Sequence, residues 1–264
     1  MAYSKLKVVA DGPVAVVTLC DPPTRNALGP AMCAELAGAL EQIARGAPAA
    51  RAVVLTGEGE AFCSGANLDD AMTLTSGDLD LQAIVERYYN PVARAIRALP
   101  VPIVTAVSGP AAGIGAAFAF QGDLIVAGES AAFTPAFARI GLVPDGGSSW
   151  ILPRLVGRVR AMEMLLLGEP LSARQAYAWG LVNRCVPDPQ ALPTAMELAR
   201  RLASGPASLG MTRRLVLDGL ERDWEAQLAA EAAAQGAAGR TADFREGLAA
   251  FFEKRAPCFR GPGG

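Results

Sequence analysis

The sequence contains no histidine among its 264 residues. Histidine is the usual general base near neutral pH and the partner of most nucleophilic serines and cysteines, so Ser-His and Cys-His catalysis are excluded. Its absence also removes the commonest ligand of zinc and iron, and we predict no metal site. Any acid–base chemistry must therefore rest on other side chains, with carboxylates first among them.

The sequence also lacks a C-x-x-C pair, and its five cysteines are an odd number. We therefore expect reduced, buried thiols and a cytoplasmic protein rather than a disulfide framework. The amino-terminal residues contain no apolar stretch followed by a cleavage site, so no signal peptide is predicted. The cysteines are Cys20, Cys33, Cys63, Cys185 and Cys258.

Neither a large excess of one charge nor a long apolar run is present. The formal net charge is −2, which gives no reason to expect nucleic acid or an anionic membrane as a partner. The longest nearly uncharged run, residues 104–120, is interrupted by glycine and proline and is rich in small residues. It does not read as a membrane-spanning helix, and we expect a soluble protein.

Strand, turn and helix patterns recur along the first two thirds of the chain. The sequence predicts a β-hairpin around Asp11–Pro13, and buried strands in "RAVVLTG" and "VPIVTAVSG". Helical spacing follows in "GPAMCAELAGALEQIAR" and, with Pro91 expected to mark a kink, in "LQAIVERYYNPVARAIRAL". From about Ser172 onward strand signals stop and helical patterns remain. A parallel-rich α/β core with a helical carboxyl-terminal region is predicted.

One carboxylate, Asp145, lies in the apolar stretch "GLVPDGGSSW". Apolar surroundings disfavour the charged form of a carboxyl group and raise its pKa towards working pH, as catalysis requires. The alternative is that Asp145 caps the helix that begins at "GGSSWILPRL". The neighbours expected to supply the apolar surroundings are Phe137, Ile140, Leu142, Val143 and Trp150.

Two glycine-rich turns, "CSGAN" and "AAGIG", each follow a predicted buried strand. Glycine at strand ends lets backbone N–H groups point at a ligand, although each turn alone is also explained by structure. The stretch "GIGAAF" begins like a dinucleotide-binding fingerprint, but Phe118 replaces its third small residue and no acidic residue follows at the required distance. The sequence therefore does not favour a nicotinamide cofactor.

Six motifs in order resemble the enoyl-CoA hydratase/isomerase (crotonase) superfamily and together span nearly the whole chain. The pairing of "GLVPDGG" with the terminal "GRTADFREGLAAFFEKRAP" is most similar to the epoxyphenylacetyl-CoA isomerase branch. The motifs are "RNAL", "FCSGANL", "VSGPAAGIG", "GLVPDGGSSWILPRLVG", "LSARQAYAWGLVNRCV" and "REGLAAFFEKRAPCF".

The resemblance implies an α/β fold built as a spiral of β-β-α repeats, followed by a helical trimerisation region. Residues 1–200 would form the spiral core and residues 201–264 the oligomerisation region. The implied partners are an acyl-CoA thioester substrate and further copies of the chain, as a homotrimer or a dimer of trimers. No cofactor is implied, because coenzyme A enters as part of the substrate.

The resemblance also implies the catalytic groups. The backbone N–H groups of Ala66 and Ile114 match the family's two oxyanion donors, which stabilise a thioester enolate. Family hydratases use two glutamates, but this sequence has Ala117 and Phe137 at those positions. Asp145 lies where several isomerase-like relatives carry an acid. One carboxylate is enough to move a proton between carbons, so the sequence favours an isomerase.

The family's contacts to coenzyme A are implied for residues from four of the motifs. Phe251 and Lys254 resemble residues that reach coenzyme A, often from a neighbouring subunit, and Asn67 replaces an aspartate found in most relatives. Segment Ala71–Asn90 would cover the acyl pocket, with Tyr88 and Tyr89 either contacting the acyl group or packing within the fold. The implied substrate-binding set is Arg25, Ala27, Leu28, Ser64, Asn67, Leu68, Gly113, Phe137, Phe251 and Lys254.

Three other functions fit the same motifs. Asp145 would act as a nucleophile in an aromatic acyl-CoA dehalogenase, although those enzymes also employ a histidine. A weak hydratase would work with Asp145 alone. A non-catalytic homologue would bind acyl-CoA thioesters without exchanging their protons. The sequence does not identify the acyl group.

Overall fold

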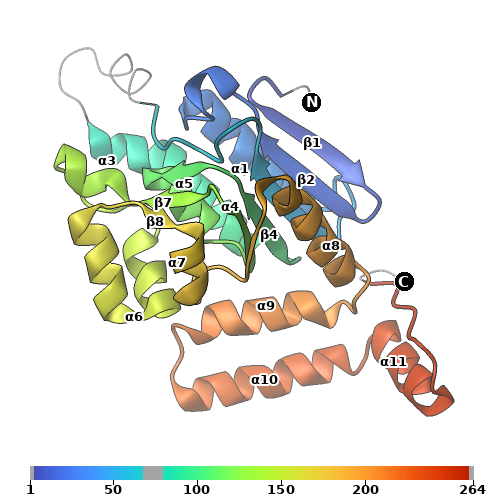
Figure 1. The fold of residues 1–264 in the computed structure, drawn as a ribbon. Coiled ribbons are helices and arrows are strands. Elements are labelled where there is room, and N and C mark those ends of the chain that lie inside the picture. The colour runs from blue at the N-terminus through green and yellow to red at the C-terminus, as the bar shows by residue number, and fades with distance from the viewer. Residues whose placement is uncertain (1–2, 68–79, 262–264) are drawn as a thin grey trace.

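The computed structural model describes residues 3–67 and 80–261, and a six-stranded sheet lies at the centre of this part of the chain (Figure 1). Strands β1 (Leu6–Asp11) and β2 (Val14–Leu19) pair antiparallel, which confirms the predicted hairpin. The other four strands continue the sheet in parallel. They are β3 (Ala52–Gly57), β4 (Ile103–Val107), β6 (Leu124–Gly128) and β9 (Arg184–Val186), in the order β1-β2-β3-β4-β6-β9.

A second, three-stranded sheet has the order β5-β7-β8 and consists of β5 (Pro110–Ala112), β7 (Ala132–Thr134) and β8 (Leu171–Ser172). The chain alternates between the two sheets. Strands β4 and β5 lead into helix α5 (Gly113–Ala119), and β6 and β7 lead on to α6 (Ser148–Leu167). The predicted α/β class with strand–strand–helix repeats is therefore confirmed.

Strand β8 ends at Ser172 and was not predicted, and β9 contradicts the expectation that strand structure ends at about Ser172. They contain only two and three residues. Such short segments carry no periodic hydrophobic pattern, so sequence periodicity alone does not reveal them.

Helices cover both faces of the large sheet. Helix α1 (Pro30–Ala44) lies over one face, and α8 (Ala191–Ala203) packs small side chains against Val54 and Val104 on the other. Helix α7 (Ala173–Ala178) lies beside β8. The predicted boundary after residue 200 falls within α8, and the division into two regions stays a prediction.

Pro91 follows a π-helical turn within an uninterrupted stretch of helical backbone, and the predicted kink stays a prediction. A π-helical turn, Val85–Tyr89, separates the short α3 (Leu81–Ile84) from α4 (Asn90–Ala98), and Pro91 lies in the first turn of α4. The Asn90 N–H donates to the Val85 carbonyl across the π-helical turn, so the helix continues into α4, and a π-helical turn is a usual site of irregularity within a helix.

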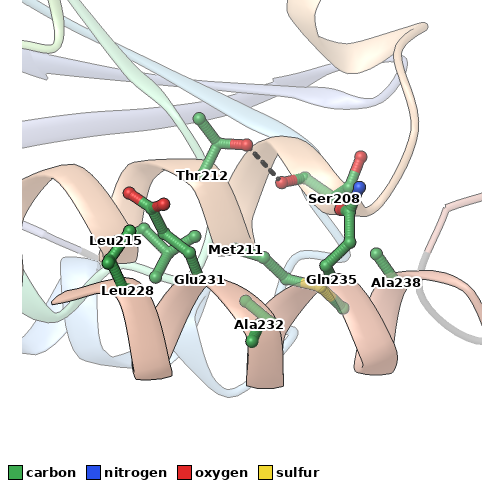
Figure 2. A pocket seen from close by; sticks show the side chains of 10 residues that line it. Ser208, Met211, Thr212, Leu215, Leu228, Glu231, Ala232, Gln235 and Ala238 are labelled. Carbon is green, nitrogen blue, oxygen red and sulfur yellow. Dashed lines mark hydrogen bonds between the residues drawn. The ribbon is translucent and has the colours of Figure 1, made fainter. Parts of the chain in front are cut away.

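Three helices, α9 (Ser208–Gly219), α10 (Trp224–Ala238) and α11 (Ala242–Glu253), extend beyond the core (Figure 1). All residues of α10 are described, and none of them is buried. A hollow of about 490 Å³ lies between α9 and α10. Figure 2 shows the side chains that line it, among them Thr212, which donates a hydrogen bond to the Ser208 carbonyl. The predicted helical carboxyl-terminal region is confirmed.

The five cysteines, all within the described residues, are free thiols. Cys33 and Cys63 are buried, but Cys20 and Cys185 are only half-buried and Cys258 is exposed, so the expectation of buried thiols is wrong for the last three. In the described ranges, no helix combines the length and the hydropathy that a bilayer span requires.

Candidate active site

Asn26 fixes the loop that follows β2. Its side chain is fully buried, and its amide nitrogen donates to the carbonyls of Ala61 at 2.8 Å and Glu58 at 3.0 Å. Its Oδ1 accepts the backbone N–H of Asp21 at 2.8 Å. Asn26 lies within the "RNAL" motif, but no sequence pattern predicted this role for it. Asn26 ties the loop to the turn after β3, and its backbone adopts φ 60°, a left-handed conformation that asparagine tolerates.

The segments that resemble the coenzyme A contacts run side by side. The Leu28 N–H donates to the Gly65 carbonyl at 2.7 Å, and the Ser64 N–H donates to the Arg25 carbonyl at 2.9 Å. The Asn67 N–H donates back to Leu28 at 3.2 Å. The structure therefore brings the Arg25–Leu28 loop together with Ser64–Asn67, and the Arg25 side chain is exposed. Leu68 lies outside the described residues.

The two glycine-rich turns are packed against each other. The Ala112 N–H donates to the Cys63 carbonyl at 2.9 Å. A Cβ at Gly65 would approach the Ala112 carbonyl oxygen to 3.0 Å, and a Cβ at Gly115 would lie 2.7 Å from the Cys63 Cβ. Only glycine permits this close approach, so both turns need their glycines to meet.

Within the described part of the chain, two backbone N–H groups at this junction are left without a ladder or helix partner. Leu28 bonds to Gly65 and Asn67 on either side of Ala66, which turns the Ala66 N–H away from that pair of segments. Ile114 is the second residue of α5, where an N–H has no intrahelical acceptor and the helix dipole favours negative charge. The arrangement suits an anionic oxygen.

Asp145 begins a tight turn immediately before α6. The Ser148 N–H donates to the Asp145 carbonyl at 3.0 Å, and the central residues Gly146 and Gly147 have φ of 57° and 82°. Two positive φ values identify a type I′ turn, which glycine adopts without strain.

The Asp145 turn packs directly on α5. A Cβ at Gly146 would collide with the Cδ1 of Ile114 and would lie 2.9 Å from the Cβ of Ala117. The carboxylate-bearing turn and the helix that presents the Ile114 N–H are therefore in contact. Any larger residue at position 146 would push them apart.

The Asp145 carboxyl group is desolvated. Its Oδ1 is buried without a hydrogen-bond partner among the described residues. Burial raises its pKa to about 6, against the lowering effect of a hydrogen bond from its own backbone N–H. The capping alternative is wrong, because Gly147 is the N-cap of α6 and no side chain caps that helix.

Three of the sequence neighbours that were expected to bury the Asp145 carboxyl group do not do so. Ile140, Leu142 and Val143 are exposed, with Val143 81% accessible. The contacts of the Asp145 turn come instead from Ile114 and Ala117 on α5. Trp150 places its ring against the guanidinium of Arg154, 4.0 Å from its centroid, and of Arg97, 5.0 Å away. Of the predicted neighbours, Phe137 is buried.

Three aromatic residues and one lysine predicted from the family pattern have other surroundings in the single chain. Tyr89 is buried in the core, and Tyr88 is half-buried beside the Arg87 guanidinium. Phe251 is 76% exposed on α11, and Lys254 follows that helix. Figure 1 shows α11 far from α5 and β7, so one chain alone does not bring Phe251 and Lys254 to the site.

A further cavity of about 740 Å³ lies behind the Asp145 turn, between α4, α6 and α9. Gly146, Gly147 and Gln121 line one of its sides. In the described ranges, no three side chains of the metal-ligating types gather closely enough to hold an ion.

Comparison with known proteins gives consistent matches. The family model of enoyl-CoA hydratase/isomerase matches residues 10–262. The 1,2-epoxyphenylacetyl-CoA isomerase of Escherichia coli is 43% identical over 250 residues, which covers 94% of this chain and 95% of that protein. The "Probable enoyl-CoA hydratase" of Rhodobacter capsulatus is 44% identical over 262 residues, with 99% of this chain and 100% of that protein covered.

The fold has a close counterpart among solved structures. The crystal structure of enoyl-CoA hydratase from Bacillus anthracis superposes with a TM-score of 0.91 at 30% sequence identity. The superposition covers 97% of this chain and 99% of that one. The predicted crotonase-like spiral is confirmed.

Proposed function

The chain belongs to the enoyl-CoA hydratase/isomerase family, and from that premise we propose that it is an acyl-CoA isomerase in which Asp145 carries the proton. The observation that supports this most is the desolvated Asp145 carboxyl group on a turn packed against α5. The substrate is an enoyl-CoA whose double bond moves, or a ring epoxide of a phenylacetyl-CoA-derived thioester. The second class follows from the E. coli relative's name.

In the double-bond shift, the ionised Asp145 removes a proton from the carbon next to the thioester carbonyl. The electron pair moves onto the thioester oxygen, which accepts hydrogen bonds from the Ala66 and Ile114 N–H groups. The protonated Asp145 then returns the proton to the far end of the allylic system, and the carbonyl reforms. No atom is gained or lost and no redox change occurs, so the reaction is proposed to need no cofactor.

The same residues disfavour hydration. Adding water requires one group to deprotonate the water and another to protonate carbon. Ala117 and Phe137 occupy the two positions at which family hydratases carry glutamate, and both are buried apolar side chains. A weak hydratase that uses Asp145 alone is the second candidate, favoured by the R. capsulatus relative's name.

The paired segments beside the site are proposed to bind coenzyme A. Backbone groups of Ala27, Leu28 and Gly113 lie at the same junction as the Ala66 N–H, and the exposed Arg25 is free to meet a phosphate. Asn67 lacks the charge of the aspartate expected there, so it is proposed to act by hydrogen bonding. Ser64 and Phe137 complete the proposed binding residues, with Phe251 and Lys254 contributed by a neighbouring copy.

Incubation in D₂O with three substrates tests the proposed function. A 3-enoyl-CoA or an epoxyphenylacetyl-CoA is expected to isomerise and incorporate deuterium, whereas crotonyl-CoA is expected to yield no hydroxyacyl product at a comparable rate. Mass spectrometry of the acyl products reports both results. Rapid hydration of crotonyl-CoA would instead establish a hydratase, and binding without exchange would establish a non-catalytic homologue.

We further propose that the chain assembles in the cytoplasm as a homotrimer or a dimer of trimers. Helix α6 presents an exposed apolar row at helical spacing, and such a row needs a partner. Light scattering is expected to give three or six chains, and the double substitution Val159→Glu and Met162→Glu is expected to dissociate them. A monomeric wild-type protein at micromolar concentration would refute this. The row is Val159, Met162 and Leu166, which follow the break in α6 at Gly157.

A further inference from the structure

The turn that carries Asp145 can adopt two backbone conformations. Its central peptide joins Gly146 to Gly147, and rotating that peptide converts a type I′ turn into a type II′ turn by changing φ at the second glycine to a negative value. Glycine populates positive and negative φ about equally, so two adjacent glycines do not select one form. The structure has the type I′ form, with Gly147 at φ 82°.

One side chain holds the central peptide in that form. The Gln121 amide donates from Nε2 to the Gly146 carbonyl oxygen at 3.0 Å, in a partly buried contact. That carbonyl belongs to the peptide that would have to rotate. Rotation would break the hydrogen bond and leave both groups without it, which weakens the turn wherever water cannot replace the lost partner.

Gln121 is itself presented from a rigid base. It follows the last turn of α5, where its own N–H donates to the Phe118 carbonyl at 3.2 Å. The buried Thr105 hydroxyl on β4 donates to the Ala119 carbonyl at 3.0 Å and fixes the end of the helix to the sheet. The backbone of Gln121 is thus anchored to the sheet through the end of α5.

The Asp145 turn consequently touches α5 at both ends. Ile114 and Ala117 meet Gly146 near the start of the helix, and Gln121 meets its carbonyl just beyond the end. The same helix presents the N–H of Ile114 at its first turn. One rigid element therefore sets the positions of the carboxylate turn and of one proposed oxyanion donor.

We propose that Gln121 is a positioning residue for Asp145, acting by locking the Gly146–Gly147 peptide so that the carboxylate stays aligned with the acyl chain. This inference rests on the proposed isomerase function. Gln121 moves no proton itself, because its amide is engaged with Gly146. Its loss is expected to affect the alignment of the proton carrier more than the binding of the thioester.

Replacing Gln121 by leucine removes the donor at similar size. For the isomerisation of whichever substrate the wild type accepts, kcat is expected to fall about 10- to 100-fold while KM stays within about twofold, since misplacement of a catalytic group by about 1 Å costs up to about 10²-fold. Gln227→Leu is the matched control. Gln227 donates to the Leu215 carbonyl at 3.3 Å between α10 and α9, and its loss is expected to leave kcat unchanged.

Gln121→Glu supplies a readout that a merely structural role would not move. A protonated glutamic acid can donate to the Gly146 carbonyl, but a carboxylate cannot. The ratio of this variant's kcat to the wild-type kcat at the same pH is expected to be highest at low pH and to fall as the glutamate ionises. A merely structural role would give a ratio that does not change with pH. The charged groups lining the cavity beside Gln121 are the same in all variants: Arg94, Arg97, Asp123, Arg154, Arg213 and Glu221.

Each outcome decides a different point. A folded Gln121→Leu variant with wild-type kcat, or a Gln121→Glu variant with a wild-type pH profile, would overturn the positioning role. Circular dichroism and thermal unfolding check that the variants are folded. If the Gln121→Leu variant does not fold, the Gln121→Glu variant still tests the positioning role. Full isomerase activity in Asp145→Asn would instead overturn the proposed function, whatever the Gln121 variants show.

Discussion

Asp145→Asn is expected to lower the isomerisation rate by about 10²- to 10⁴-fold, the usual contribution of a positioned acid–base group. Asparagine has nearly the same shape but cannot accept and return a proton. Binding of the acyl-CoA thioester is expected to stay within about twofold, because the proposed contacts to coenzyme A lie on other segments. Single-turnover kinetics and deuterium incorporation measure the loss.

Asp223→Asn is a matched control for this substitution. The Asp223 carboxylate caps α10 by accepting the Ala226 N–H at 2.8 Å, and asparagine caps helices equally well. The control is expected to keep full activity. An Asp145→Asn variant that also keeps it would remove Asp145 from the mechanism.

The wild-type pH profile follows from the state of the same carboxyl group. The base form is the ionised form, and burial places the pKa of Asp145 at about 6. The value of kcat/KM is therefore expected to rise with pH through about 6 and to level off above it, and a profile that is flat between about pH 5 and 8 would contradict this.

The contribution of Asp145 to wild-type stability is expected to depend on pH in the opposite sense to that of a paired carboxylate. The folded-state pKa of about 6 lies above the ordinary value of 3.8, so the folded state holds more protons than the unfolded state between these values. Wild-type stability falls as pH rises through this window, by up to about 3 kcal/mol. Asparagine does not ionise and avoids this cost.

Urea unfolding at about pH 4 and about pH 8 measures the difference. The variant is expected to gain free energy of unfolding over the wild type at the higher pH but not at the lower. A gain or loss that is the same at both values would show that Asp145 is not desolvated in solution. Increased stability together with lost activity is the pattern expected of a functional group held in an unfavourable environment.

Local patterns predicted most of this fold. The β1–β2 hairpin, the apolar strands β3 and β4 and the long helices α1 and α8 all have a hydrophobic period that lies within one segment. The family and its epoxyphenylacetyl-CoA isomerase-like branch also followed from ordered motifs, and the comparisons confirm them. Strands β8 and β9 were not predicted because such short segments do not define a hydrophobic period.

The surroundings of Asp145 show what a sequence pattern does not contain. Its neighbours along the chain are apolar, which predicted the direction of its pKa, yet Val143 and Ile140 are exposed to solvent. The contacts of its turn come from α5, a helix well upstream in the chain. Burial of a single side chain is a property of tertiary packing. The direction of the pKa shift of Asp145 was therefore predicted correctly, but partly from neighbours that do not bury it.

Two other residues have decisive roles that no local signal marks. Asn26 is buried in a left-handed conformation inside a motif whose other residues were assigned roles. Arg213 and Arg214 are adjacent and chemically identical in the sequence, but Arg213 is buried and Arg214 is exposed. Only the direction of each side chain from α9 distinguishes them. The apolar residues of α9 are spread around the helix, so its periodicity leaves that direction undetermined.

Arg213→Met is expected to lower the free energy of unfolding by about 1–3 kcal/mol, the usual cost of leaving hydrogen-bonded groups without their partner. The Arg213 guanidinium meets the Asp123 carboxylate at 2.7 Å. It also donates to the carbonyls of Ile96 at 2.9 Å, Arg97 at 2.9 Å and Leu99 at 2.8 Å. Removing it leaves the Asp123 carboxylate and three carbonyls at the end of α4 without this partner.

The pH dependence of this loss distinguishes the ion pair from simple packing. Burial raises the pKa of Asp123 above its ordinary value even though Arg213 lowers it. Without Arg213 the pKa rises further, and the variant loses stability as pH increases through the window between the unfolded and folded values. The deficit relative to wild type is therefore expected to be larger at about pH 8 than at about pH 5, and adding Asp123→Asn is expected to restore part of it at the higher pH.

Arg214→Met supplies the control one residue away on the same helix. Arg214 is exposed, so its loss is expected to change the free energy of unfolding by no more than about 0.5 kcal/mol. Equal effects of the two substitutions would refute the anchoring role of Arg213. Because Arg213 joins α9 to the end of α4 and to the Asp123 turn before β6, its loss is also expected to increase amide hydrogen exchange in α9 before it does so in β4, which packs within the core.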